Sequence, residues 1–141
     1  MRFAGVNLIA VLVAAIAMYA IGFVLYGVLF EDQWMAWTGT SEEMAQAAMG
    51  RMYLSPIMPL LAAFGLATVY RWAGVDGLPR AMKVSVALWL FFAVSILLYG
   101  YVYSTMRVEA FALDCAHLLL NYVVGGAIIA LWPRGRVRTT A

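Results

Sequence analysis

The sequence is poor in charged residues. Only 11% of its 141 residues are charged, whereas 66% are hydrophobic, and the mean hydropathy is +0.90. Soluble domains are about a quarter charged and roughly half apolar, so the composition excludes a soluble globular domain as well as an intrinsically disordered chain. The net charge of +2 is too small for a nucleic-acid-binding surface, and we expect no nucleic-acid partner. The composition is typical of a small integral membrane protein.

Cysteine and histidine are almost absent. Cys115 is the single cysteine, so an intrachain disulfide is excluded, and its place in an apolar run predicts a buried, inert thiol. With one cysteine and one histidine, a single copy cannot supply a zinc tetrad or a bis-histidine haem site. The sequence also lacks a Ser-His-Asp order, a phosphate-binding glycine loop and a zinc-protease motif. We therefore expect no enzymatic activity, no metal and no cofactor.

Four long hydrophobic runs are present, at about 7–30, 53–72, 84–105 and 110–132. Each is long enough to cross the hydrocarbon as a helix, which takes roughly 20 residues. The first run, with its flanks, extends from Phe3 to Phe30 with Asn7 as its only strongly polar residue, and these 28 residues are about twice a usual signal-peptide core. The sequence predicts an all-α membrane protein with a single domain of four spans, the first of them retained.

The basic residues are distributed unevenly between the two ends of these spans. Seven lie on one side and two on the other, which predicts that both termini are cytoplasmic and that the chain lies in the cell inner (plasma) membrane. The larger set is Arg2, Arg71, Arg80, Lys83, Arg134, Arg136 and Arg138, and the smaller set is Arg51 and Arg107. The acidic residues expected outside are Glu31, Asp32, Glu42, Glu43 and Glu109.

The first outer connection carries an amphipathic segment at 40–51. Thr40 and Glu43 stand at capping-box spacing before a stretch rich in Met and Ala, which predicts a short helix lying on the membrane surface. Tryptophan rings favour the headgroup layer. Four are expected to act as interfacial anchors: Trp34, Trp37, Trp72 and Trp132.

The other connections are short. The composition of segment 73–80 predicts a turn, and the very short connection around Arg107 predicts that the last two spans form an antiparallel hairpin. Pro56 and Pro59 are expected to bend the second span. The related segments VLYGVLF and LLYGYVY, at 24–30 and 97–103, raise the alternative that two hairpins are pseudo-repeats.

The first helix carries a recognisable pattern. In the run from Val6 to Trp34, the six residues that match it are Val6, Asn7, Gly22, Tyr26, Phe30 and Trp34. This run resembles the opening of the domain-of-unknown-function 1761 family, although Leu25 stands where that family usually has Trp and Val28 where it often has Pro. The last span, with Asp114 and Gly126, is similar to the family's closing segment. The resemblance implies a four-helix membrane fold and no established activity.

The fourth span holds the chain's one polar stripe. Asp114, His117 and Asn121 lie at positions i, i+3 and i+7, which confines them to a strip of helix surface roughly 60° wide. An ionisable group facing lipid is costly, so the stripe must face protein or water. If the last two spans form a tight hairpin, Tyr99 and Tyr103 come level with Asp114, and a phenol could donate to its carboxylate.

Three interpretations of this stripe stay open. It is a buried cluster that fixes helix packing through interhelical hydrogen bonds, a path for protons or ions, or a contact to a metal or to a haem of a neighbouring subunit. The leading functional hypothesis is a non-catalytic interaction protein, acting as an accessory subunit of a membrane assembly or as a homo-oligomer. The alternative is a small oligomeric carrier or channel lined by Asp114, His117 and Asn121. In both cases the partners are the lipid bilayer and other membrane polypeptides or copies of the chain.

The topology can be tested by labelling. With native Cys115 replaced by Ser, single cysteines at Ser41 and Thr139 should react oppositely with a membrane-impermeant thiol reagent on intact cells, since the basic asymmetry places Ser41 outside. Equal labelling of the two positions would contradict the predicted orientation.

Overall fold

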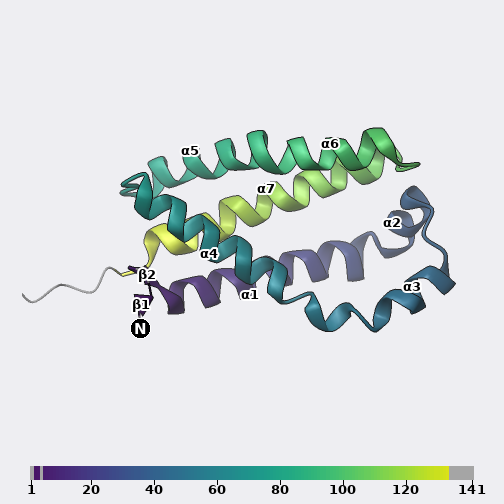
Figure 1. The fold of residues 1–141 in the computed structure, drawn as a ribbon, viewed down its shortest axis with the longest axis horizontal. Coiled ribbons are helices and arrows are strands. Elements are labelled where there is room, and N and C mark those ends of the chain that lie inside the picture. The colour runs from purple at the N-terminus through teal and green to yellow at the C-terminus, as the bar shows by residue number, and fades with distance from the viewer. Residues whose placement is uncertain (1, 4, 134–141) are drawn as a thin grey trace, which may run out of the picture.

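Four long helices form the body of the protein (Figure 1). The structure, a computed structural model, describes residues 2, 3 and 5–133. In this part of the chain, four helices are long and apolar enough to cross a membrane: Leu8–Leu29, Met52–Trp72, Leu78–Tyr103 and Val108–Leu131. The all-α fold with four candidate spans is therefore confirmed. The basic residues Arg134, Arg136 and Arg138, and Thr139, lie outside the described residues.

Two of the four helices contain a π-helical turn. The first comprises α1 (Leu8–Val24) and η1 (Leu25–Leu29), and the third comprises α5 (Leu78–Leu88), η3 (Trp89–Ala93) and α6 (Val94–Tyr103). The second and fourth are α4 (Ile57–Trp72), which follows a 3-10 turn at Met52–Leu54 (η2), and α7 (Val108–Leu131). A π turn accommodates one extra residue and so changes which face the following residues present.

The two ends of the bundle differ. One end, called the terminal end below, holds the antiparallel strand pair β1 (Arg2–Phe3) and β2 (Val6–Asn7), the α4–α5 turn and the last turn of α7 (Figure 1). The opposite, loop end holds α2 (Glu31–Thr38), α3 (Glu42–Met49) and the α6–α7 turn. The Arg107 amide donates to the Trp37 carbonyl oxygen at 3.0 Å, which ties α2 to the α6–α7 turn.

Several boundaries differ from those expected. The third span begins at Leu78 rather than at residue 84, because Gly77 takes a positive φ of 74° and Pro79 lies in the first helical turn, where its missing N–H costs nothing. Pro56 caps α4 and Pro59 lies in its first turn, so these prolines start the helix instead of bending it.

The segment 40–51 contains a short helix, α3, with a different cap from the one expected and an additional neighbour. Ser41, not Thr40, is the N-cap of α3, and its Oγ accepts a hydrogen bond from the Met44 amide at 3.2 Å. Thr40 instead shares a 2.7 Å contact with the Thr38 hydroxyl at the end of α2, a helix that the sequence analysis did not anticipate. That α3 lies on a membrane surface stays a prediction.

The two segments proposed as a pseudo-repeat do not share a conformation. Val24–Phe30 contains the π turn η1, whereas Leu97–Tyr103 is regular α-helix within α6. Their matching tyrosines also differ, since Tyr26 is half-buried and Tyr99 is 69% exposed. The structure gives these segments no equivalent role.

Helix α7 lies at the centre of the bundle and packs against α1, α4 and α5 (Figure 1). Its Gly125 faces Met18 of α1 so closely that an added Cβ would collide with the Met18 methyl group. Helix α1 also packs on α4, and the buried small residues of these two helices are Ala10, Ala14, Ala15, Ala63 and Ala67. Small residues permit such close approach of helices, which in lipid replaces the missing hydrophobic drive.

A buried hydroxyl pair joins α4, α5 and α7 beside Gly126. The Tyr70 hydroxyl lies 2.9 Å from the Ala81 carbonyl oxygen and 2.7 Å from the Ser85 Oγ, which in turn donates to the Tyr122 carbonyl oxygen at 2.7 Å. A Cβ added at Gly126 would collide with both hydroxyl oxygens. The absence of a side chain at Gly126 therefore leaves room for the hydroxyl groups of Tyr70 and Ser85.

We expect Gly126→Ala to lower the melting temperature in detergent, because Tyr70 and Ser85 are both buried and cannot move aside without losing hydrogen bonds. Overpacking of this kind typically costs about 1–3 kcal/mol. Gly65→Ala in α4 is the matched control, since nothing lies within 4 Å of its added Cβ. A Gly126→Ala protein as stable as Gly65→Ala would contradict this packing.

Candidate functional site

The polar stripe of α7 faces α1. Because the two helices run in opposite directions, residues spaced by four along the first span meet α7 in reverse order: Tyr26 meets Asp114, Gly22 meets His117, and Met18 meets Gly125. The stripe therefore lies against protein, as the sequence analysis required.

Asp114 accepts a hydrogen bond from the first span. The Tyr26 hydroxyl donates to its Oδ1 at 2.6 Å, a short distance typical of a phenol bonded to a carboxylate. Tyr26 lies within the π turn η1, which ends where the Phe30 amide donates to the Leu25 carbonyl oxygen at 2.9 Å. Irregular turns of this kind occur frequently at functional sites.

His117 occupies the middle of the cluster. Its ring packs edge-on against that of Tyr26, with centroids 4.9 Å apart, and its Nε2 accepts a hydrogen bond from Asn121 Nδ2 at 3.0 Å, which needs the ring proton on Nδ1. A Cβ added at Gly22 would lie 3.1 Å from this Nε2. The absence of a side chain at Gly22 thus makes room for the imidazole.

Two buried polar atoms beside the cluster have no hydrogen-bond partner within the described part of the chain. They are the Asn121 Oδ1, in a residue that is 8% exposed, and the Trp34 Nε1. The Trp34 ring packs edge-on against Tyr26 with a centroid distance of 5.8 Å. One acceptor and one donor therefore remain available for a water molecule or another polar group.

The prediction that Tyr99 or Tyr103 donates a hydrogen bond to Asp114 was wrong. Tyr99 and Tyr103 stack on each other with centroids 6.1 Å apart and are 69% and 81% exposed, so they point away from the cluster. The carboxylate is instead bonded by Tyr26, from the first span. A hairpin between neighbouring helices places residues level with each other, but the rotation of each helix decides which side chains face inward.

The four tryptophans expected as anchors lie near the ends of the spans. Trp34 and Trp37 belong to α2 at the loop end, and Trp72 and Trp132 lie at the terminal end. Trp72 is 79% exposed, whereas Trp34 packs against the polar cluster and so also belongs to the candidate site.

The chemistry available to the cluster is hydrogen bonding and proton exchange. It combines a carboxylate, a phenol, an imidazole and a carboxamide in one interface. Among the described residues, no group of three or more His, Cys, Asp or Glu could hold a metal ion.

Comparison with known proteins identifies the family of the chain. A family model described as a protein of unknown function (DUF1761) matches residues 9–130. The chain belongs to the DUF1761 family. No curated protein and no solved structure matches it.

In this DUF1761 chain, residues that carried the sequence resemblance meet in space. Gly22 faces His117, Tyr26 bonds Asp114, and Trp34 covers Tyr26. The sequence analysis left Gly22 and Tyr26 out of the polar cluster. Their four-residue spacing on one face of the first helix was the available signal.

We expect Tyr26→Phe to destabilise the protein, because it leaves the Asp114 carboxylate without its phenol donor. An orphaned buried polar group costs about 1–3 kcal/mol, or more when charged. Tyr99→Phe is the matched control, since Tyr99 is exposed. Melting temperatures in detergent decide between them, and equal values would contradict the assigned hydrogen bond.

The same contact can be tested from its other side. Asp114→Asn keeps an acceptor for Tyr26 and should be tolerated better than Asp114→Leu, which removes it. A leucine variant as stable as the unmodified protein would show that the cluster is not a packing device.

Proposed function

We propose that this DUF1761 protein is a non-catalytic membrane subunit that acts by association with copies of itself or with other membrane polypeptides. It would lie in the inner (plasma) membrane with both termini in the cytoplasm and without a nucleic-acid partner. The observation that supports this proposal is that Tyr26, Asp114, His117 and Asn121 engage one another inside a single chain. Side chains engaged in this way stabilise the α1–α7 interface.

The segment beyond the cluster also favours a structural role. From Asn121 to Leu131, α7 carries no acidic, basic or histidine side chain. Its contact with α1 there is Met18 against Gly125, and the hydroxyl pair of Tyr70 and Ser85 fills the space at Gly126. A proton path through one chain would need water or groups from another subunit to pass this closely packed region.

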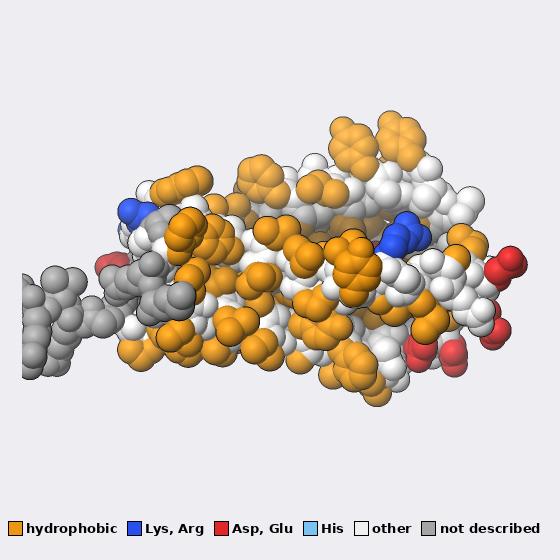
Figure 2. Space-filling model, turned by 60° about the horizontal axis from the view of Figure 1, so that its bottom comes forward, with side chains coloured by type: hydrophobic (Ala, Val, Ile, Leu, Met, Phe, Trp, Pro, Cys, Tyr) orange, Lys and Arg blue, Asp and Glu red, His pale blue; other side chains and the backbone are white. Residues whose placement is uncertain are grey.

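The outer surface supports association. Between 17% and 28% of the most apolar stretch of each span is buried within the chain. Figure 2 shows many hydrophobic side chains on the visible face along the middle of the bundle, with acidic side chains gathered at one end. Such a surface must contact lipid or other membrane polypeptides. Because most of each span's apolar stretch is not buried within the chain, enough area remains for both kinds of contact.

A second candidate function is a small oligomeric carrier or channel that uses Asp114, His117 and Asn121. The observation that favours it is the pair of unsatisfied buried atoms, Asn121 Oδ1 and Trp34 Nε1, beside the carboxylate and the imidazole. These atoms could serve a transported proton or solute if several copies together enclosed a path.

Reconstituted protein distinguishes the two functions. In sealed vesicles with an imposed pH gradient, we expect the protein alone to dissipate the gradient no faster than empty vesicles do, because α7 carries no acidic, basic or histidine side chain from Asn121 to Leu131. A leak that disappears on Asp114→Asn or His117→Ala would overturn the association proposal and make the cluster a pathway.

Association itself is measured on protein extracted gently from its native membrane. A particle larger than one chain, containing other polypeptides or pigment absorption, supports an accessory subunit, and a homo-oligomer supports self-association. A particle containing one chain only would contradict the proposal.

A further inference from the structure

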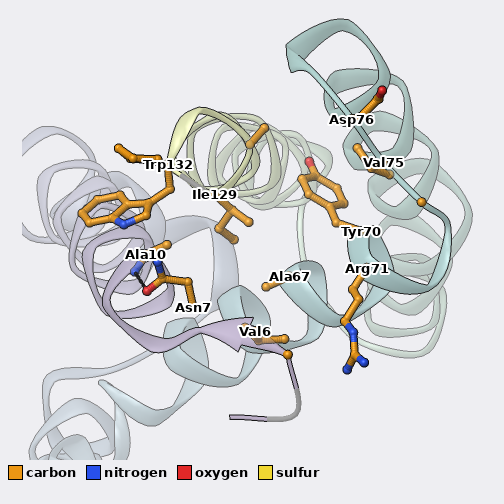
Figure 3. A pocket seen from close by; sticks show the side chains of 14 residues that line it. Val6, Asn7, Ala10, Ala67, Tyr70, Arg71, Val75, Asp76, Ile129 and Trp132 are labelled. Carbon is orange, nitrogen blue, oxygen red and sulfur yellow. Dashed lines mark hydrogen bonds between the residues drawn. The ribbon is translucent and has the colours of Figure 1, made fainter. Parts of the chain in front are cut away.

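A cavity of about 510 Å³ opens at the terminal end of the bundle, away from the polar cluster. Its walls come from four parts of the chain: β2 with the start of α1, the end of α4, the α4–α5 turn, and the end of α7 (Figure 3). The volume falls within the roughly 300–1,000 Å³ of small-molecule sites. The association proposed above does not use this cavity.

Part of the cavity wall is apolar. Ala10, Ala67 and Ile129 project from three different helices toward the same space (Figure 3). Tyr70 lies beside them, but its hydroxyl belongs to the buried junction with Ser85. An occupant would therefore place an apolar part against this wall.

The polar groups that line the cavity are mainly hydrogen-bond donors. The Asn7 Oδ1 caps α1 by accepting from the Ile9 amide at 3.0 Å, so its Nδ2 is the group left for an occupant. Trp132 carries an indole N–H and Arg71 a guanidinium with five N–H donors, and neither side chain can accept a hydrogen bond. This set matches an occupant that is rich in acceptors.

The Arg71 guanidinium lies close to the turn between β1 and β2. The turn between β1 and β2 contains Gly5 at a positive φ of 76°, and a Cβ there would lie 2.5 Å from the Arg71 Cζ. The guanidinium thus rests against the turn at the rim of the cavity. Among the described lining residues Asp76 is the one acid, and Figure 3 shows it turned in the opposite direction from Arg71.

We propose that this cavity binds a phosphate ester that carries an apolar part, with the phosphate at Arg71 and the apolar part against Ala10, Ala67 and Ile129. A guanidinium matches phosphate oxygens with two parallel hydrogen bonds. Arg80 and Lys83, in the first turns of α5, lie toward the same end and raise the local concentration of anions. The ligand is either a membrane phospholipid or a soluble phosphate ester, which share this chemistry.

Native mass spectrometry of the full chain in detergent tests the proposal with phosphatidylglycerol as the probe. Arg71→Gln should weaken binding at least about tenfold, because it removes a hydrogen bond to a charged group as well as one basic charge, whereas loss of a nearby basic charge alone weakens binding roughly fivefold. Arg80→Gln is the matched control, because Arg80 lies at the same end and donates to the Ala73 carbonyl oxygen at 3.1 Å but does not line the cavity. If both variants lost phosphatidylglycerol binding equally, the loss would reflect general surface charge, and the proposed site would be overturned.

A second variant tests the cavity without changing charge. Ala130 lines it, and Ala130→Phe should weaken phosphatidylglycerol binding while Arg71 stays in place. If Arg71→Gln lowers the melting temperature in the absence of lipid, its loss of binding could come from unfolding. In that case the binding measured for Ala130→Phe decides whether the cavity holds the lipid. Unchanged binding by Ala130→Phe would overturn the proposal.

Glycerol 1-phosphate distinguishes the two sources of the ligand. If it displaces phosphatidylglycerol from the unmodified protein, the cavity accepts a soluble phosphate ester. If it does not, the apolar part is required and the ligand is a membrane lipid.

Discussion

The close approach of α1, α4 and α5 to one segment of α7 organises the bundle. At Gly125 and Gly126 the central helix has no side chains, and Met18 from one side and the Tyr70–Ser85 pair from the other fill the space. Lipid provides no hydrophobic drive to bring helices together, so close packing and interhelical hydrogen bonds must do so. Both act at these two residues, where side chains of α1, α4 and α5 meet α7.

This closely packed segment separates two polar regions. Toward the loop end lies the cluster of Asp114, His117 and Asn121 with Tyr26, and toward the terminal end lies the cavity beside Arg71. The cluster joins helices through bonds inside the chain, whereas the cavity presents donors to its surroundings. The separation fits different roles for them, one in holding the helices of the chain together and the other in the ligand binding proposed above.

The cluster also illustrates how a membrane protein accommodates an ionisable group. Asp114 is half-buried in an apolar bundle, where an isolated carboxylate would be costly. A phenol at 2.6 Å and an edge-on imidazole–phenol pair surround it with polar partners from the first and last spans. The contact thereby ties together two helices that are distant in sequence.

The sequence by itself determined the membrane class, the four spans, the family and the stripe on α7, because hydropathy over about 20 residues and helical periodicity are local properties. It could not determine which face of each helix turns inward. The sequence predicted Tyr99 and Tyr103 as the residues level with Asp114, yet Tyr26 is its partner and both other tyrosines are exposed. The rotation of each helix about its axis depends on contacts with elements far away in the sequence. The cavity likewise exists only in the tertiary structure, because Asn7, Arg71 and Trp132 are far apart along the chain and only the folded bundle brings them to one space.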